Sequence, residues 1–140
     1  MGHRDKLAKL GRTASHRDAM LSNMATSLFK HRVIKTTDAK AKALRPVVDR
    51  IIATAKQETL AAKRQVARTI QEKDVFKKLF TEIVPQFHDR DSGFTRVIKS
   101  GFRRGDGAPM AVVELLTEKP PEQTDDKKAK KAKQSKKPKP

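Results

Sequence analysis

Two apolar stripes with helical spacing constrain the fold of this chain more than any other feature of its sequence. In residues 20–29, pairs of adjacent apolar side chains recur every four positions, starting from Met20. This spacing places them on one face of a helix, and residues 44–55 follow the same rule. Ser15, with Asp18 three residues later, predicts the start of the first helix through a capping box. The chain must therefore bury at least two helical faces in one core.

The segment between the two stripes predicts a strand. Residues 33–37 are short and rich in β-branched side chains, which favour strands. Thr37 or Asp38 is then expected to cap the second helix. Further along, Glu58 or Thr59 is expected to open a third helix.

The second half of the chain predicts one more helix and then two strands. The fourth helix is expected to run from Asp74 to Pro85, because proline lacks the backbone donor that would continue it. Residues 94–99 and 110–116 have the composition of strands, and the Gly-rich, basic residues 100–109 join them as a hairpin loop that reaches away from the body. The predicted order is α-β-α-α-α-β-β, which is an α+β fold.

The charge of the chain indicates a polyanionic partner. The 33 Lys and Arg residues exceed the 16 Asp and Glu residues, so the net charge is +17. Such a surplus repels itself unless a polyanion neutralises it, and nucleic acid adds the gain from counterion release. An anionic membrane is the alternative, but its ligands usually present aromatic side chains at the interface. Trp and Tyr are absent here, and most Phe residues fall on expected core positions, so nucleic acid is the better partner.

Composition divides the chain into three parts. Residues 1–14 are basic with few large apolar side chains, which predicts an extended RNA-binding arm, with a frayed terminus as the alternative. Residues 15–119 contain the predicted helices and strands and form the domain. Residues 120–140, rich in Lys, Pro and Ala, are predicted to be a disordered Lys-rich tail. That tail either adds non-specific affinity for RNA or serves solubility.

Basic side chains, and hydroxyls near helix starts, are the candidate binding residues. They cluster in the arm and around the predicted helix-strand-helix unit, and two adjacent arginines follow on the Gly-rich loop. Arginine forks suit phosphate, and free amides at helix starts bind it too. A lone surface lysine is by default a solvated charge, so the prediction depends on the clustering. The residues expected to contact RNA are His3, Arg4, Lys6, Lys9, Arg12, Thr13, Ser15, His16, Arg17, Arg32, Lys35, Thr36, Thr37, Lys40, Lys42, Arg45, Arg96, Arg103 and Arg104.

The sequence shows no motif of catalysis or metal binding. Its four histidines lack the spacing of a metal site, and Cys is absent, which fits a reducing, cytoplasmic location. The run Gly105-Asp106-Gly107 leads into a predicted strand and not into a helix, so it predicts a turn rather than a nucleotide loop. The chain is therefore expected not to be an enzyme, and to use no metal ion, cofactor, small-molecule substrate or membrane.

Three ordered blocks of the sequence resemble a known family. They resemble the bacterial large-subunit ribosomal protein L-seventeen family, and the resemblance covers roughly residues 1–116. The blocks are residues 11–17 with 20–24, residues 36–42 with 44–46, and residues 94–96 with 103–106 and 108–111.

This resemblance implies a fold and a function. It implies a two-layer domain with the order α-β-α-α-α-β-β. It also implies a structural constituent of the bacterial large ribosomal subunit that binds and stabilises large-subunit ribosomal RNA. The expected location is the cytoplasmic ribosome near the mouth of the peptide exit tunnel, beside neighbouring ribosomal proteins.

A DNA-compacting protein is the main alternative from another class. The first two predicted helices could form a helix-turn-helix, but a strand is predicted where that motif needs a tight turn. An enzyme is the third alternative, and the absence of a convergent catalytic set argues against it.

Overall fold

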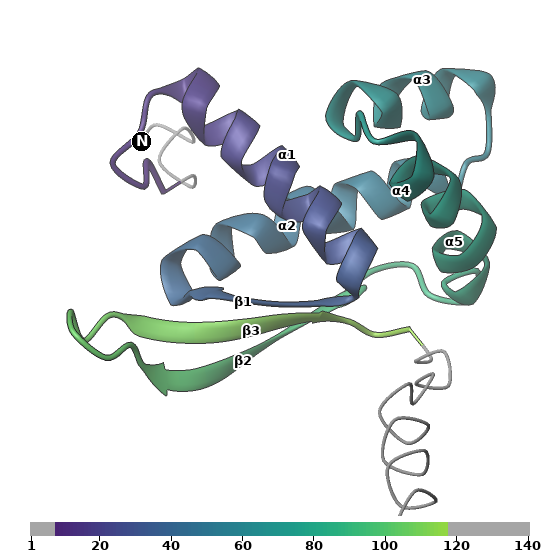
Figure 1. Ribbon diagram of the computed structural model, residues 1–140. Coiled ribbons are helices and arrows are strands. Elements are labelled where there is room, and N and C mark those ends of the chain that lie inside the picture. Colours follow the sequence, from purple (N-terminus) through teal and green to yellow (C-terminus); the bar gives the residue numbers. More distant parts are fainter. Residues whose placement is uncertain (1–7, 118–140) are drawn as a thin grey trace, which may run out of the picture.

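The helices cover one face of a small antiparallel sheet (Figure 1). A computed structural model describes residues 8–117. The predicted tail and residues 1–7 of the predicted arm lie outside that range. The elements are α1 (Ala14–His31), β1 (Val33–Thr37), α2 (Asp38–Ala55), α3 (Leu60–Thr69), α4 (Lys73–Lys78), a π-helical segment (Leu79–Ile83), α5 (Val84–Gln86), β2 (Thr95–Phe102) and β3 (Pro109–Leu115). The α+β class is confirmed.

The sheet joins the two halves of the chain. Its strand order is β1-β3-β2, and both pairings are antiparallel. Ile34 of β1 lies opposite Val113 of β3, so a strand near the N-terminus pairs with the last strand of the described chain. At the end of α1 the Leu115 amide donates to the Arg32 carbonyl at 3.0 Å. The position of β1 is therefore set by contacts about eighty residues away in sequence.

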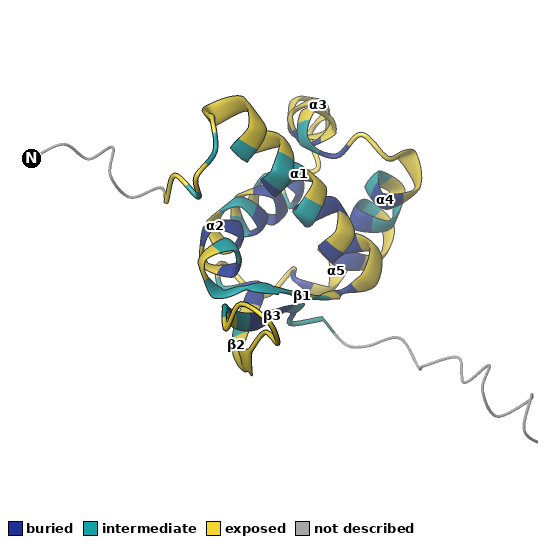
Figure 2. Cartoon of the chain, turned by 60° about the vertical axis from the view of Figure 1, so that its left-hand side comes forward, coloured by how far each residue is buried: buried dark blue, intermediate teal, exposed yellow. Residues whose placement is uncertain are grey.

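The two apolar stripes form the core, as the sequence predicts. Leu28 and Phe29 of α1 are fully buried, as are Leu44 and Ile52 of α2. They pack in one cluster with Val113 of β3. Figure 2 shows the buried positions of α1 and α2 turned toward the interior, and the exposed positions on the outer faces.

The predicted start of the first helix at Ser15 is wrong. The helix begins at Ala14, and Thr13 is the N-cap residue with an extended backbone. Helical bonding already begins there, because the Arg17 amide donates to the Thr13 carbonyl at 2.9 Å. Ser15 therefore lies inside the first turn, where it is exposed and caps nothing.

The two open alternatives for the later caps are resolved. Thr37 is the N-cap residue of α2, although its side chain makes no capping bond. Thr59 is the N-cap residue of α3, and its hydroxyl accepts a hydrogen bond from the Ala62 amide at 3.1 Å. A side-chain bond of this kind satisfies one of the free amides of the first turn.

The prediction that the fourth helix runs from Asp74 to Pro85 is also wrong. The helix begins at Lys73, widens into the π-helical segment, and continues as α5 through Pro85 to Gln86. Pro85 directly follows the π-helical segment, whose wider turns shift the backbone hydrogen-bonding pattern, and the helix passes through the proline without ending there. The helix instead ends at Phe87, whose ring packs edge-on against Phe94 at 5.1 Å between centroids.

The hairpin between β2 and β3 is longer, and its turn shorter, than predicted. β2 continues to Phe102, which pairs with Pro109. The pairing is irregular between Lys99 and Phe102, and Gly101 within that interval has a φ of +79°. A bulge with a left-handed glycine lets a strand continue through a local change of direction.

Candidate nucleic-acid interface

A groove between α1, β1 and the start of α2 brings candidate residues from three elements together. Its volume is about 560 Å³. Its polar lining consists of His16, Asn23 and Ser27 of α1, Lys35 and Thr36 of β1, and Lys40 of α2. No Asp or Glu is among the lining residues. Four of the residues predicted to contact RNA therefore border the groove, although Lys35, next to the core-packed Ile34 on β1, projects from the opposite face of the sheet.

The starts of two helices lie beside this groove, and Asp38 in the first turn of α2 offsets part of the positive potential there. His16 lies in the first turn of α1 and Lys40 in the first turn of α2. Both helices begin at the same end of the molecule, on the left of Figure 1. The side chains of the N-cap residues Thr13 and Thr37 form no hydrogen bond with the first turn of the helix that each precedes. Helix N-termini carry a partial positive charge and free amide donors, which attract phosphate.

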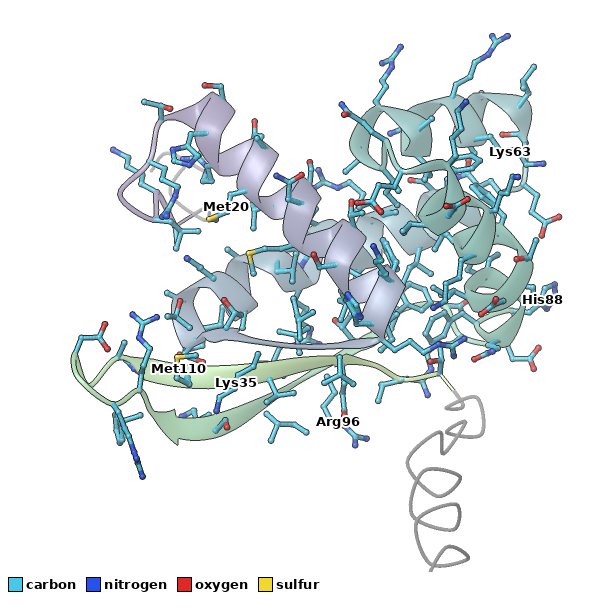
Figure 3. All side chains as sticks on the ribbon, viewed as in Figure 1. Met20, Lys35, Lys63, His88, Arg96 and Met110 are labelled. Atoms are coloured by element: carbon cyan, nitrogen blue, oxygen red, sulfur yellow. The ribbon has the colours of Figure 1, made fainter. Side chains whose placement is uncertain are left out.

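The remaining groove residues provide an apolar floor. Met20, Met24 and Ile34 are half-buried, and each contacts the core cluster from its edge. Figure 3 labels Met20 on α1, and it labels Lys35 of β1 on the side of the sheet away from the helices. A floor of this kind accommodates sugar or base surfaces, while the cations at the rim accommodate phosphate. The groove thus combines the two surface chemistries that RNA presents.

The described part of the predicted arm is turned and anchored to the domain, and it does not run extended. Leu10 packs against the core cluster, and both Leu10 and Gly11 have positive φ angles. The Arg12 guanidinium donates to the Leu10 carbonyl at 3.0 Å. Lys9 is exposed, and Arg17 in the first turn of α1 is half-buried. Among the predicted contacts, His3, Arg4 and Lys6 lie outside the described residues.

Arg32 has a structural position that the sequence did not reveal. It is the C-cap residue of α1 with a φ of +64°, and only 8% of the residue is exposed. Its guanidinium donates to Glu82 at 3.0 Å and to the Thr117 hydroxyl at 3.2 Å. These bonds join the C-terminal end of α1, the π-helical segment and the residues that follow β3. We therefore assign Arg32 to the fold and leave it out of the RNA-contacting set.

Two further candidates on α2 have acidic partners one turn away. The Lys42 ammonium lies 2.7 Å from the Asp38 carboxylate, and the Arg45 guanidinium lies 3.9 Å from that of Asp49. Exposed pairs at this spacing stabilise a helix only slightly. They nevertheless offset the charge that these two side chains offer to a phosphate.

The candidates on the hairpin are paired in the same way. The Arg96 guanidinium lies 3.4 Å from the Glu114 carboxylate across the sheet, and Arg103 Nε donates to Asp106 Oδ1 at 3.0 Å. The Arg103 hydrogen bond is the largest influence that lowers the pKa of Asp106, to about 2. Within residues 8–117, Arg104 has no acidic partner and is exposed on the turn. Arg104 is therefore the uncompensated cation of the hairpin tip.

Sequence reasoning missed a second group of exposed cations. They lie on α3 and α4, and they are Lys63, Arg64, Arg68, Lys73 and Lys77. These cations were overlooked because the predicted clusters included only the arm, the predicted helix-strand-helix unit and the Gly-rich loop. A helical spacing of four between Arg64 and Arg68 would have marked one exposed face of α3.

Two negative findings concern the described part of the chain. Within residues 8–117, no group of three His, Cys, Asp or Glu side chains is arranged to hold a metal ion. Over the same range no helix has the length and apolar character needed to span a membrane.

Fold and groove together define a small basic α+β protein that presents cations and helix N-termini at one end of a compact core. Comparison with known proteins makes the class specific. The family model described as "Ribosomal protein L17" matches residues 20–116. The large ribosomal subunit protein bL17 of Desulforapulum autotrophicum is 52% identical over 116 residues, covering 83% of this chain and 97% of that relative. The chain belongs to the ribosomal protein L17 family.

Family membership settles the class of function. The chain is a ribosomal protein of the large subunit with a structural role, and it is not an enzyme. The resemblance in the three sequence blocks is thereby confirmed.

Proposed function

We propose that the chain binds large-subunit ribosomal RNA and stabilises its folded form, with the groove between α1 and β1 as the main contact surface. The observation that carries the proposal is the groove itself, where His16 and Lys40 lie at two helix starts, Lys35 borders the edge of the sheet, and no lining residue is acidic. Folded RNA needs its phosphates neutralised wherever its helices approach one another, and cations on a rigid core can do this. Support for the ribosomal setting comes from family membership.

The termini extend this surface in the proposal. Residues 1–14 act as a basic arm that follows the RNA beyond the groove, and residues 15–119 hold the arm and the hairpin at a fixed separation. Residues 120–140 add non-specific affinity or serve solubility, and deletion of the tail distinguishes the two. A weaker salt-dependent affinity after deletion supports the first role, and lower solubility at unchanged affinity supports the second.

The assembled position in the proposal is the cytoplasmic ribosome, near the mouth of the peptide exit tunnel and beside other ribosomal proteins. This position is carried by the resemblance to the family. Sedimentation of cell extract at low and high salt tests the association. Co-migration with the large subunit at moderate salt supports the proposal, and a chain that stays at the top of the gradient contradicts it.

Directed cleavage of the RNA tests which face of the chain binds and where. Because the chain has no Cys, a single introduced cysteine can carry a tethered iron chelate at a chosen site. Ser27→Cys places the chelate in the groove, and Ala61→Cys places it on the exposed side of α3 as a matched control. We expect strong cleavage of large-subunit RNA near the tunnel mouth from position 27 and weak cleavage from position 61. The reverse pattern would assign RNA binding to the α3 face.

The DNA-compacting alternative has no support in the fold. Strand β1 separates α1 from α2, so these two helices do not form a helix-turn-helix. Competition between protein-free ribosomal RNA and duplex DNA tests this directly. A preference for duplex DNA would favour the alternative over the proposal.

A further inference from the structure

Phe102 stands apart from the other phenylalanines of the chain. Three of the six rings are buried, and Phe76 and Phe80 pack against the core from its edge. Phe102 is 79% exposed, the highest value among the exposed large apolar side chains of residues 8–117. Single exposed apolar residues are common, so exposure alone does not indicate a role. The position of this ring is what suggests one.

The hairpin holds Phe102 on an ordered support. It is the last residue of β2 and pairs with Pro109, directly after the irregular pairing at Gly101. The adjacent turn is closed by hydrogen bonds from the Arg103 amide to the Ala108 carbonyl at 2.9 Å and from the Gly107 amide to the Arg103 carbonyl at 3.0 Å. Bulges commonly re-aim a side chain, and an ordered support lowers the entropic cost of a contact.

Basic residues flank Phe102 in the sequence. Lys99 precedes it on β2, and Arg103 and Arg104 follow it on the turn. The acidic residue of the turn, Asp106, is engaged by Arg103. Lys99 and Arg104 have no acidic partner within the part of the chain that the structure describes. An exposed aromatic ring between cations matches an unpaired nucleotide, whose base offers a π face and whose phosphates need neutralising.

We propose that Phe102 stacks on an unpaired base of the RNA that the chain binds, while Arg104 neutralises a neighbouring phosphate. This inference rests on the proposed function, because it assumes an RNA ligand. It adds a second type of contact. The groove binds RNA through its charge and shape, and the tip of the hairpin stacks on an unpaired base. Any base can stack, so the contact selects an unpaired nucleotide and not a sequence.

The first test compares the salt dependence of RNA binding among full-length variants. Phe102→Ala is expected to weaken binding to protein-free large-subunit ribosomal RNA by about five- to a hundredfold, with an unchanged slope against salt, because stacking releases no counterions. Phe102→Leu keeps an apolar side chain but loses the π face, so it is expected to behave like the alanine variant. Arg104→Gln is expected to reduce the slope by about 0.7–0.9. Leu60→Ala, which removes another exposed apolar side chain, is the matched control.

The second test uses fluorescence. The chain has no Trp and no Tyr, so Phe102→Trp introduces a single indole at the hairpin tip. We expect its emission to be quenched when ribosomal RNA is added, because stacking brings the indole against a base. Leu60→Trp reports on α3 and is expected to stay bright.

The outcomes separate this inference from the proposed function. If the wild-type chain fails to bind RNA, both are wrong. If it binds, but Phe102→Ala binds equally well or Phe102→Leu retains full affinity, only the stacking proposal is overturned. Equal quenching at positions 102 and 60 would also overturn it. A loss of assembly into the large subunit at unchanged RNA affinity would instead assign Phe102 to a pocket on a neighbouring protein.

Discussion

The groove and the hairpin turn carry similar numbers of candidate cations but use them differently. The groove has no acidic lining residue, and the lysines that border it are Lys40 of α2 and Lys35 at the edge of the sheet. On the hairpin, Arg96 and Arg103 are each paired with a carboxylate, and Arg104 remains for a phosphate. The comparison teaches that a basic residue becomes a binding residue only when the fold keeps acidic side chains away from it. Counting charge along the sequence cannot make that distinction.

The largest expected effect comes from removing the core that supports both regions. Leu28→Ala is expected to lower the free energy of unfolding by about 2–5 kcal/mol, because Leu28 of α1 is fully buried in the core cluster. Chemical denaturation measures the change, with the exposed Leu60→Ala as control. Equal stability of the two variants would contradict the core assignment.

A smaller loss of stability is expected at the junction between the regions. Arg32→Ala removes the bonds to Glu82 and Thr117 from a largely buried position, at an expected cost of about 1–3 kcal/mol. The slope of RNA affinity against salt should not change, because the Arg32 guanidinium bonds Glu82 and Thr117 within the protein. A reduced slope at normal stability would return Arg32 to the RNA-contacting set.

Matched charge removal tests the comparison itself. Lys35→Gln with Lys40→Gln removes two charges from the groove, and we expect the slope of RNA affinity against salt to fall by about 0.7–0.9 for each phosphate that the variant no longer neutralises. Lys42→Gln with Arg45→Gln removes the same charge from side chains that already have acidic partners, so its effect should be smaller. Equal slopes for the two double variants would show that internal pairing does not decide which cations bind.

The smallest effect is expected from the hairpin turn under acid. The pKa of Asp106 is lowered to about 2 by its bond to Arg103, so the folded turn favours the charged carboxylate. Its contribution is complete above the ordinary carboxyl pKa of about 4 and is lost as the pH falls from there through 2. Amide chemical shifts of Gly107 and Ala108 in the folded protein are expected to titrate with a midpoint at the lowered pKa of about 2, and Asp106→Asn should abolish the change. A titration near pH 4 would indicate that the pair does not form.

Much of the fold was predictable because its cause is local. The apolar stripes of α1 and α2 appear as helical spacing, and the β-branched run of β1 appears as strand composition. The errors were local as well, and each has a physical cause. Ser15 matched a capping pattern, yet helical bonding starts at Thr13, and Pro85 fell where a helix accepts it.

For the candidate site, the sequence by itself determined the charge, the residue types and the family resemblance. Only the tertiary structure decided which of those residues meet. His16 and Lys40 border one groove because α1 packs against α2, and Arg32 leaves the surface because Glu82, fifty residues away, completes a bond with it. The exposure of Phe102 likewise depends on how the hairpin extends from the sheet. Spacing along a chain sets which face of an element a side chain occupies, but packing between elements sets its neighbours and therefore the charge it has left for a partner.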